Sequence, residues 1–239
     1  MRERASFLKA GENFLEFLEQ WYYDLPVISW KSLLAEHPPE ETAIVAVDVV
    51  NGFCKEGNLA SPRVNAIVAP VVDLLRSADE NGVRNYLLVQ DCHPADSLEF
   101  HTYPPHCVEG TIETQTVSEL TDLPQASLFL ALPKRTINPG LEENLQQWLL
   151  SHTGVRQFVL VGDCTDICIY LTAMFLKTWF VRQGTRVNVV VASNCVDTYD
   201  IPVNTDHSQD VLPHPGELLH VLFLYHMCLN GMQVVREIR

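Results

Sequence analysis

The sequence predicts an α/β protein with three layers, α/β/α, built around a mostly parallel six-stranded sheet. Runs of apolar residues alternate along the chain with segments of helical spacing, as in repeated strand–helix units. The apolar runs are nearly continuous, which is typical of parallel strands that are covered by helices on both faces. The 239 residues, 47% of them hydrophobic, suffice for one sizeable core.

The N-terminal segment is predicted to stand apart from this sheet. Aromatic and aliphatic residues recur at helical spacing over residues 5–24, which indicates an amphipathic helix. The run HPPEE, residues 37–41, is typical of a linker. We therefore expect a helical extension with its linker over residues 1–41 and the main domain over residues 42–239.

The strands and helices of the main domain follow in order. Strands are expected at 42–50, 84–91, 127–132, 156–163, 186–193 and 232–238. Helices are expected at 64–81, 139–151, 166–182 and 215–230. Asn138 before Pro139 is a start signal for the second helix, and Thr165 or Asp166 is expected to cap the third.

Composition and charge exclude several classes of protein. The formal charge of −14 argues against a nucleic-acid partner. No apolar run approaches the ~18–20 residues of a membrane span, and the N-terminus lacks the pattern of a signal peptide. Seven scattered cysteines without a CxxC pair favour reduced thiols, and hence a cytoplasmic protein.

Reactive side chains gather where the predicted strands end. In open parallel sheets the ligand site lies outside the carboxyl ends of the strands. Those ends carry Asp48, then Asp91 with His93, then Lys134, and finally the stretch from Gly162 to Cys168. An acid, an imidazole, a lysine and a thiol are thus expected at one edge of the sheet.

The thiol of Cys168 has two interpretations. The N-terminus of a helix lowers the pKa of a thiol, so Cys168 is a candidate nucleophile; it could equally be a buried structural cysteine. Asp48 could be its general base or a loop cap, and Lys134 an electrostatic partner or a solvated loop end. Cys164 is expected to serve as scaffold, with its N–H and that of Cys168 as an oxyanion hole.

A second cluster lies within residues 90–107. Asp91, His93, Glu99, His101 and His106 offer oxygen and nitrogen donors in one short loop. Such a set without thiolates suits Zn²⁺, Fe²⁺ or Mn²⁺ in an open site, although a polar loop with coincidental histidines is the alternative.

Six stretches, taken together, resemble the isochorismatase-like cysteine hydrolases, and most closely the plant-type nicotinamidases among them. They occur in the family's order over about residues 42–238, as VDVVNGFC, DCHP, YPPHCVEGT, PKRTIN, GDCTDICIYLTA and HPGELLHVLFLYHMCLNGMQVV. The resemblance implies the fold described above and an amidohydrolase that converts nicotinamide to nicotinate and ammonia through a cysteine thioester. It also implies one divalent transition metal ion, zinc before iron or manganese. The aromatic residues of the N-terminal helix favour a contact between subunits, and hence a homo-oligomer, although this helix could equally cover the sheet of its own chain.

The resemblance also implies a role for individual residues. The catalytic residues would be Asp48, Lys134 and Cys168, and the backbone amides of Cys164 and Cys168 would form the oxyanion hole beside a cis peptide bond between Asp163 and Cys164. The metal ligands would be Asp91, His93, Glu99 and His106, and the aromatic rings that bind the substrate would be Phe53 and Tyr103.

Two residues depart from the family pattern. Asp163 stands where the family usually has an aliphatic residue, and His101 competes with Glu99 as the fourth metal ligand. Three alternatives therefore remain open at this point: a cysteine hydrolase of another small amide, such as a ureido or carbamoyl compound; a metal-dependent hydrolase with a structural cysteine; and a non-catalytic binding protein.

Overall fold

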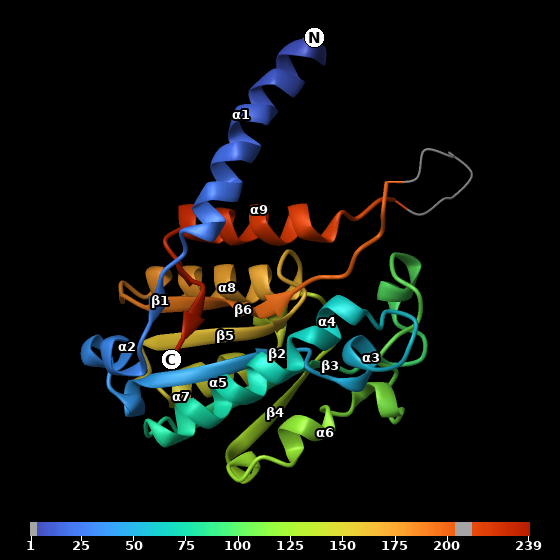
Figure 1. Cartoon of the computed structure of the whole chain (residues 1–239). Helices are drawn as coiled ribbons and strands as arrows, with labels where there is room; N and C mark the ends of the chain where they lie inside the picture. Colours follow the sequence, from blue (N-terminus) through green and yellow to red (C-terminus); the bar gives the residue numbers. More distant parts are fainter. Residues whose placement is uncertain (1–3, 204–211) are drawn as a thin grey trace.

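The structure, a computed structural model, describes residues 4–203 and 212–239 (Figure 1). Its centre is a six-stranded sheet with the order β4-β3-β2-β5-β6-β7, in which every neighbouring pair is parallel. The strands are β2 Thr42–Val47, β3 Asn85–Asp91, β4 Phe129–Lys134, β5 Gln157–Asp163, β6 Asn188–Asp197 and β7 Gln233–Val235. The predicted fold class, a parallel six-stranded sheet between helices, is confirmed.

Each face of the sheet has its own core. Ile44 and Ala46 of β2 point to one core, while Ala43, Val45 and Val47 point to the other. Two-residue alternation of this kind explains why buried parallel strands are apolar throughout. The first core is covered by α2 Trp30–Glu36, α3 Asn51–Cys54, α4 Pro62–Ala66, α5 Val68–Glu80 and α6 Ser118–Thr121. The second is covered by α7 Glu143–Ser151, α8 Cys168–Arg182 and α9 Gly216–Leu229.

Several predicted boundaries need correction. The helix expected at 64–81 is two helices, α4 and α5, because Ile67 ends the first. Asn138 caps only a short 3₁₀ turn, Pro139–Leu141, before α7 begins. The last predicted strand is divided into β7 and β8 Glu237–Ile238.

The segment before residue 42 contains more structure than the sequence indicated. The short strand β1 Val27–Ile28 pairs in parallel with β8, so that the segment after α1 lies beside the C-terminal residues. Trp30 and Leu33 of α2 are buried in the first core, and residues 39–41 form a 3₁₀ turn. The domain division at residue 41 remains a prediction.

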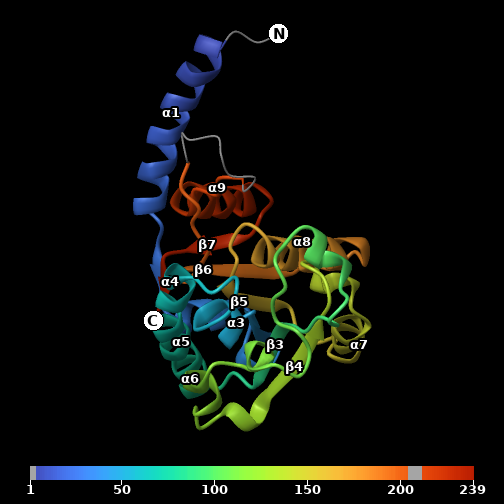
Figure 2. The same cartoon turned by 90° about the vertical axis from the view of Figure 1, so that its right-hand side faces the viewer.

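The N-terminal helix α1 Arg4–Tyr23 is present as predicted, and it projects beyond the rest of the molecule from its place on α9 (Figures 1 and 2). Phe14, Phe17 and Trp21 pack around the ring of Tyr225 on α9, at centroid distances of 5.6, 5.6 and 5.2 Å. Phe14 and Phe17 nevertheless remain 39% and 49% exposed. Among the described helices, none has the length and hydropathy needed to cross a bilayer.

Candidate active site

The predicted reactive residues meet at the point where the strand order changes direction. From β2 the chain moves to β3 on one side, and it later returns to place β5 on the other side. Asp48 follows β2 directly, and Cys168 opens α8 after β5. Asp91 and Lys134 end β3 and β4. A crevice of this kind, at the carboxyl ends of the strands, is where α/β sheets bind ligands.

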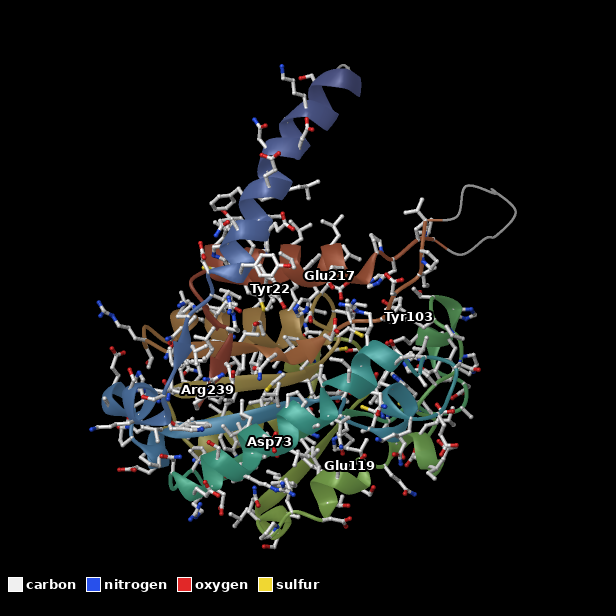
Figure 3. The ribbon with its side chains drawn as sticks, viewed as in Figure 1. Tyr22, Asp73, Tyr103, Glu119, Glu217 and Arg239 are labelled. Atoms are coloured by element: carbon white, nitrogen blue, oxygen red, sulfur yellow. The ribbon has the colours of Figure 1, made fainter. Side chains whose placement is uncertain are left out.

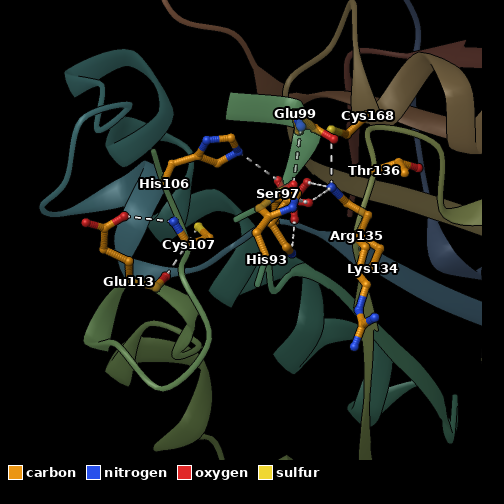
Figure 4. Close-up of polar contacts among 12 residues, drawn as sticks. His93, Ser97, Glu99, His106, Cys107, Glu113, Lys134, Arg135, Thr136 and Cys168 are labelled. Atoms are coloured by element: carbon orange, nitrogen blue, oxygen red, sulfur yellow. Dashed lines mark hydrogen bonds and ion pairs between the residues drawn. The ribbon is translucent and has the colours of Figure 1, made fainter. Parts of the chain in front are cut away.

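Lys134 is the centre of this arrangement. Its ammonium Nζ lies 2.9 Å from Asp48 Oδ2, 2.5 Å from Asp91 Oδ1 and 3.5 Å from Cys168 Sγ. All four side chains are buried, and Figure 4 shows the contact between Lys134 and Cys168. We call Asp48, Lys134 and Cys168 the lysine cluster.

Hydrogen bonds to its backbone and to its side chain hold Asp48 in place. Its N–H donates to the Val89 carbonyl, and its Oδ1 accepts the backbone N–H of Asp91, both at 2.8 Å. Its φ of 56° is the left-handed conformation, which turns the chain sharply at the end of β2. Burial, with repulsion from Asp91, raises the pKa of Asp48 to about 6, although Lys134 opposes this shift. A carboxylate with this proton affinity is suited to general-base chemistry near neutral pH.

The protonation state of Cys168 differs from the sequence-based expectation. Burial raises the pKa of its thiol well above the usual value, and the attraction of Lys134 only partly offsets the burial. The position at the N-terminus of α8 therefore does not lower the pKa as predicted, because desolvation of the thiolate outweighs the helix dipole. Cys168 consequently rests as a thiol and needs a base. Burial also opposes the charge of Lys134, but Asp48 and Asp91 together raise its pKa, so Lys134 is charged.

Residues 164–168, which we call the nucleophile turn, join β5 to α8. The peptide bond between Asp163 and Cys164 is cis, as the family resemblance implies. Gly162 precedes it with a φ of 113°, and a side chain at this position would collide with the Val47 carbonyl. In the part of the chain that the structure describes, no carbonyl accepts the N–H of Cys164 or of Cys168. These two amides are thus available to an oxygen atom in the cavity.

The predicted cap of α8 is wrong. The residue before the helix is Ile167, and no side chain caps the helix there. Thr165 contacts His220 instead, with Oγ1 2.9 Å from Nδ1. Asp166 contacts His214, with Oδ2 2.8 Å from Nε2.

Three of the predicted metal ligands lie together beside Lys134. Asp91, His93 and His106 each offer a donor atom, and these atoms lie within 4.8 Å of one another. The Nδ1–H of His106 donates to the Pro104 carbonyl at 2.8 Å, so that Nε2 is left free to bind a metal. His93 is fully buried, and neither of its ring nitrogens makes a hydrogen bond of good geometry among the described residues, although Nε2 lies 3.3 Å from Asp91 Oδ1. A buried imidazole whose nitrogens lack hydrogen-bond partners is suited to bind a metal ion.

Glu99, rather than His101, lies at this site. Its carboxyl contributes to the wall of the cavity, and Oε1 is buried without a hydrogen-bond partner among the described residues. Burial and the charge of Asp91 raise the pKa of Glu99, a shift that a bound cation would oppose. His101, by contrast, is exposed and does not line the cavity. We call Asp91, His93, Glu99 and His106 the histidine cluster. Its donors fit a divalent transition metal ion.

A cavity connects the two clusters. It contains about 440 Å³ of space not filled by protein atoms, part of which is open to solvent. Phe53 and Tyr103 both line it, with rings 5.6 and 6.2 Å from that of His106. Local periodicity does not identify the other apolar wall residues, which are Leu59, Val64, Ile137, Ile167 and Tyr199.

Asp163 is a third buried carboxyl group at the cavity. It is 1% exposed, and Oδ2 has no hydrogen-bond partner among the described residues. Burial, with repulsion from Asp48, raises its pKa well above the usual value. Asp163 is therefore a neutral acid that can both donate and accept a hydrogen bond.

Comparisons with known proteins agree with this geometry. The family model described as the isochorismatase domain matches residues 42–210. Nicotinamidase 1 of Arabidopsis thaliana is 30% identical over 95% of this chain and 98% of its own length.

Two solved structures share the fold. The nicotinamidase of Bacillus subtilis superposes with a TM-score of 0.65 at 23% identity, over 82% of this chain and 99% of that one. The pyrazinamidase of Pyrococcus horikoshii, whose structure is a complex with zinc, superposes with a TM-score of 0.62 at 22% identity. That match covers 82% of this chain and 99% of the other.

Proposed function

The chain belongs to the isochorismatase family, and on this basis we propose that it hydrolyses nicotinamide to nicotinate and ammonia, using Cys168 as the nucleophile. The observation that carries the proposal is the position of Lys134, 2.9 Å from the Asp48 carboxylate and 3.5 Å from the Cys168 sulfur. The similarity to a nicotinamidase over almost the whole chain supports the substrate.

The first half of the reaction forms a thioester. Asp48 takes the proton of the Cys168 thiol, and the thiolate attacks the amide carbon of the substrate, so that a C–S bond forms. The carbonyl electron pair moves to oxygen, which the N–H groups of Cys164 and Cys168 stabilise. When the C–N bond breaks, Asp48 gives its proton to the leaving nitrogen, and ammonia departs.

In the second half of the reaction, water hydrolyses the thioester. Asp48 removes a proton from water as the oxygen attacks the thioester, and the same two amides again hold the oxyanion. The C–S bond then breaks, and Asp48 returns the proton to the sulfur of Cys168. Lys134 stays charged throughout and stabilises both the carboxylate and the thiolate.

The histidine cluster would hold one divalent metal ion, for which zinc is the first candidate. Bound there, such an ion would coordinate the ring nitrogen of nicotinamide and fix the orientation of the ring. Phe53 and Tyr103 stack on the ring from the cavity wall.

Asp163 supports a second candidate substrate within the same chemistry. A neutral carboxylic acid on the cavity wall could pair with a polar group that nicotinamide lacks, such as the additional N–H of a ureido compound.

Ammonia release across a panel of small amides tests both candidates. We expect nicotinamide to give the highest kcat/KM in the metal-loaded protein, and Cys168→Ala to remove turnover of every amide. A carbamoyl or ureido compound at the head of the panel would replace nicotinamide as the substrate.

The cellular setting is a further part of the proposal. All seven cysteines are free, which favours a cytoplasmic location. The partly exposed aromatic residues of α1 favour self-association into a homo-oligomer.

A further inference from the structure

The two polar residues inside the nucleophile turn are both bound by histidines from the C-terminal part of the chain. Thr165 Oγ1 lies 2.9 Å from His220 Nδ1, and Asp166 Oδ2 lies 2.8 Å from His214 Nε2. These histidines are 55 and 48 residues away in the sequence. The reaction steps described above involve none of these four side chains.

His220 connects the turn to the N-terminal helix. It is 3% exposed, on the inner side of α9, and burial lowers its pKa, so the ring is neutral. A neutral imidazole has one donor and one acceptor nitrogen. Nδ1 faces Thr165, while Nε2 lies 3.4 Å from the hydroxyl of Tyr22, which Figure 3 shows at the foot of α1 next to α9. The backbone of Thr165 is fixed as well, because its N–H donates to the Asp197 carbonyl at 3.0 Å.

His214 holds the neighbouring residue of the turn. Its Nδ1–H donates to the Tyr199 carbonyl at 2.9 Å, and its ring stacks on the Tyr199 ring at a centroid distance of 3.8 Å. The backbone of His214 exchanges two hydrogen bonds of 2.8 Å with Ile201. His214 is therefore fixed at its backbone and on both ring nitrogens, which makes it a rigid support for Asp166.

The backbone of the turn is closed by two hydrogen bonds, since the N–H groups of Ile167 and Ile169 both donate to the Cys164 carbonyl at 3.1 Å, but no side chain completes it as a helix cap. Ile167 has φ −119° and ψ −93°, outside the helical region, and no side chain caps α8 there. The amides of Cys164 and Cys168 must nevertheless converge on one oxygen atom. Oxyanion donors act at about 2.7–3.1 Å, and a misplacement of about 1 Å can lower a rate about 100-fold.

We propose that His214 and His220 are positioning residues for the oxyanion hole, acting through Asp166 and Thr165 on the two amides of the nucleophile turn. This assignment rests on the proposed function, since it assumes that an oxyanion forms at the turn. It makes α9 and the strand bridge at His214 part of the catalytic apparatus without contact to the substrate.

The first test compares two buried threonines. Thr165→Val removes the hydroxyl that faces His220 while keeping the shape of the side chain. Thr42→Val is the matched control, because Thr42, at the start of β2, is also fully buried and hydrogen-bonded. Its hydroxyl shares its proton between the carbonyls of His37 and Pro38 and accepts the side-chain N–H of Gln157. We expect Thr165→Val to lower kcat about 10-fold to 100-fold with little change in KM, and Thr165→Ser to restore most of the rate.

Thr42→Val should lose a similar free energy of unfolding and keep the wild-type kcat. Equal values of kcat in the two variants, at matched stability, would show that the Thr165 contact is only structural and would overturn the proposal.

A second measurement distinguishes a defect in the oxyanion hole from a defect at the Cys168 thiol. Pyridine-3-carbaldehyde should inhibit reversibly, because the Cys168 thiol adds to the aldehyde carbon and the resulting oxygen occupies the hole. Its affinity should fall in Thr165→Val by the same factor as kcat/KM. Alkylation of Cys168 by iodoacetamide uses no oxyanion and should stay within about twofold of wild type. Slower alkylation in parallel with kcat would place the defect at the thiol and contradict the assignment.

A double-mutant cycle tests whether the contact between Thr165 and His220 causes the decrease in kcat. His220→Phe keeps a ring next to Tyr22 but cannot hydrogen-bond to Thr165. If the contact positions the turn, the double variant with Thr165→Val should have the same kcat as either single variant. Multiplied effects would mean that the two residues act independently, which the proposal excludes.

These comparisons use the amide that the wild type hydrolyses fastest in the panel. Failure to hydrolyse nicotinamide would therefore overturn the proposed substrate, whereas an unaffected kcat in Thr165→Val would overturn the positioning role alone.

Discussion

The lysine cluster and the histidine cluster share one cavity but differ in how completely their polar atoms are paired. Lys134 contacts Asp48, Asp91 and Cys168, so the charges of the lysine cluster compensate one another within the protein. Asp48 Oδ2 makes no hydrogen bond of good geometry among the described residues, but it lies 2.9 Å from the ammonium group of Lys134, which compensates its charge. In the histidine cluster, both ring nitrogens of His93 and one oxygen of Glu99 are buried without hydrogen-bond partners among the described residues. Buried polar groups are normally paired. The difference indicates that the lysine cluster is complete in the bare protein, whereas the histidine cluster is completed by a cation.

Breaking the lysine cluster should have the largest effect. Cys168→Ala removes the nucleophile and Asp48→Asn removes the base, so each should lower kcat by about 1,000-fold or more while the protein stays folded. Residues that act as one unit are not additive, so the double variant should be hardly slower than either single one. Steady-state ammonia release measures this, and near-normal turnover in Cys168→Ala would leave the cysteine a structural residue.

Breaking the histidine cluster should remove the metal and the selectivity for the ring nitrogen. His93→Ala should lose its divalent ion by elemental analysis, whereas the exposed His101→Ala, the matched control, should keep it. The wild type should prefer nicotinamide over benzamide by about 100-fold, since a loss of orientation of about 1 Å costs that much. Phe53 and Tyr103 stack on either ring equally, so the preference should disappear in His93→Ala. Equal kcat/KM for the two amides in the metal-loaded wild type is the opposing result.

The pH dependence of kcat/KM reports on the base. In the protein without metal, burial raises the pKa of Asp48 to about 6, and repulsion from Asp91 adds to the shift. Because Asp48 must be ionised to accept the thiol proton, kcat/KM should be constant above this pH and fall tenfold per unit below it. A pH profile whose acid limb lies near the ordinary aspartate value, about pH 4, would show that the cluster does not perturb Asp48.

Substitution of Asp163 should have the smallest effect, and we expect that effect on the stability of the protein. Its folded-state pKa is raised, chiefly by burial, so the stability it contributes as a neutral acid is present at low pH and is lost as pH rises towards that pKa. Asp163→Asn is neutral at every pH. Its free energy of unfolding, relative to wild type, should therefore increase in urea titrations as the pH rises above the ordinary aspartate pKa of about 4. A difference independent of pH would mean that Asp163 is charged in the folded protein.

The sequence was sufficient to place the reactive residues at one sheet edge, because the ends of parallel strands necessarily meet there. Asp48, Asp91 and Lys134 follow or end strands that were recognisable from continuous apolar runs. The shift in the pKa of Cys168 was not predictable, since it depends on burial by residues from other elements.

Contacts between segments that are distant in the sequence also could not be predicted from local patterns. Thr165 resembles a helix cap in sequence, yet its hydroxyl contacts His220 from α9. Strand β1 has only two residues, too few for a periodic signal, and it exists because β8 lies beside it. The division of the last predicted strand has the same cause, since Arg236 separates the pairing of β7 with β6 from that of β8 with β1.

The proposed mechanism depends on a thioester at Cys168, and hydroxylamine partitioning reports on this intermediate. When nicotinamide and methyl nicotinate are each hydrolysed in the presence of hydroxylamine, the acyl group is captured either by water, as nicotinate, or by hydroxylamine, as the hydroxamate. Because both substrates pass through the same thioester, the ratio of hydroxamate to nicotinate should be identical for the two. Nicotinate formed without hydroxamate, or a ratio that depends on the leaving group, would contradict a common cysteine thioester.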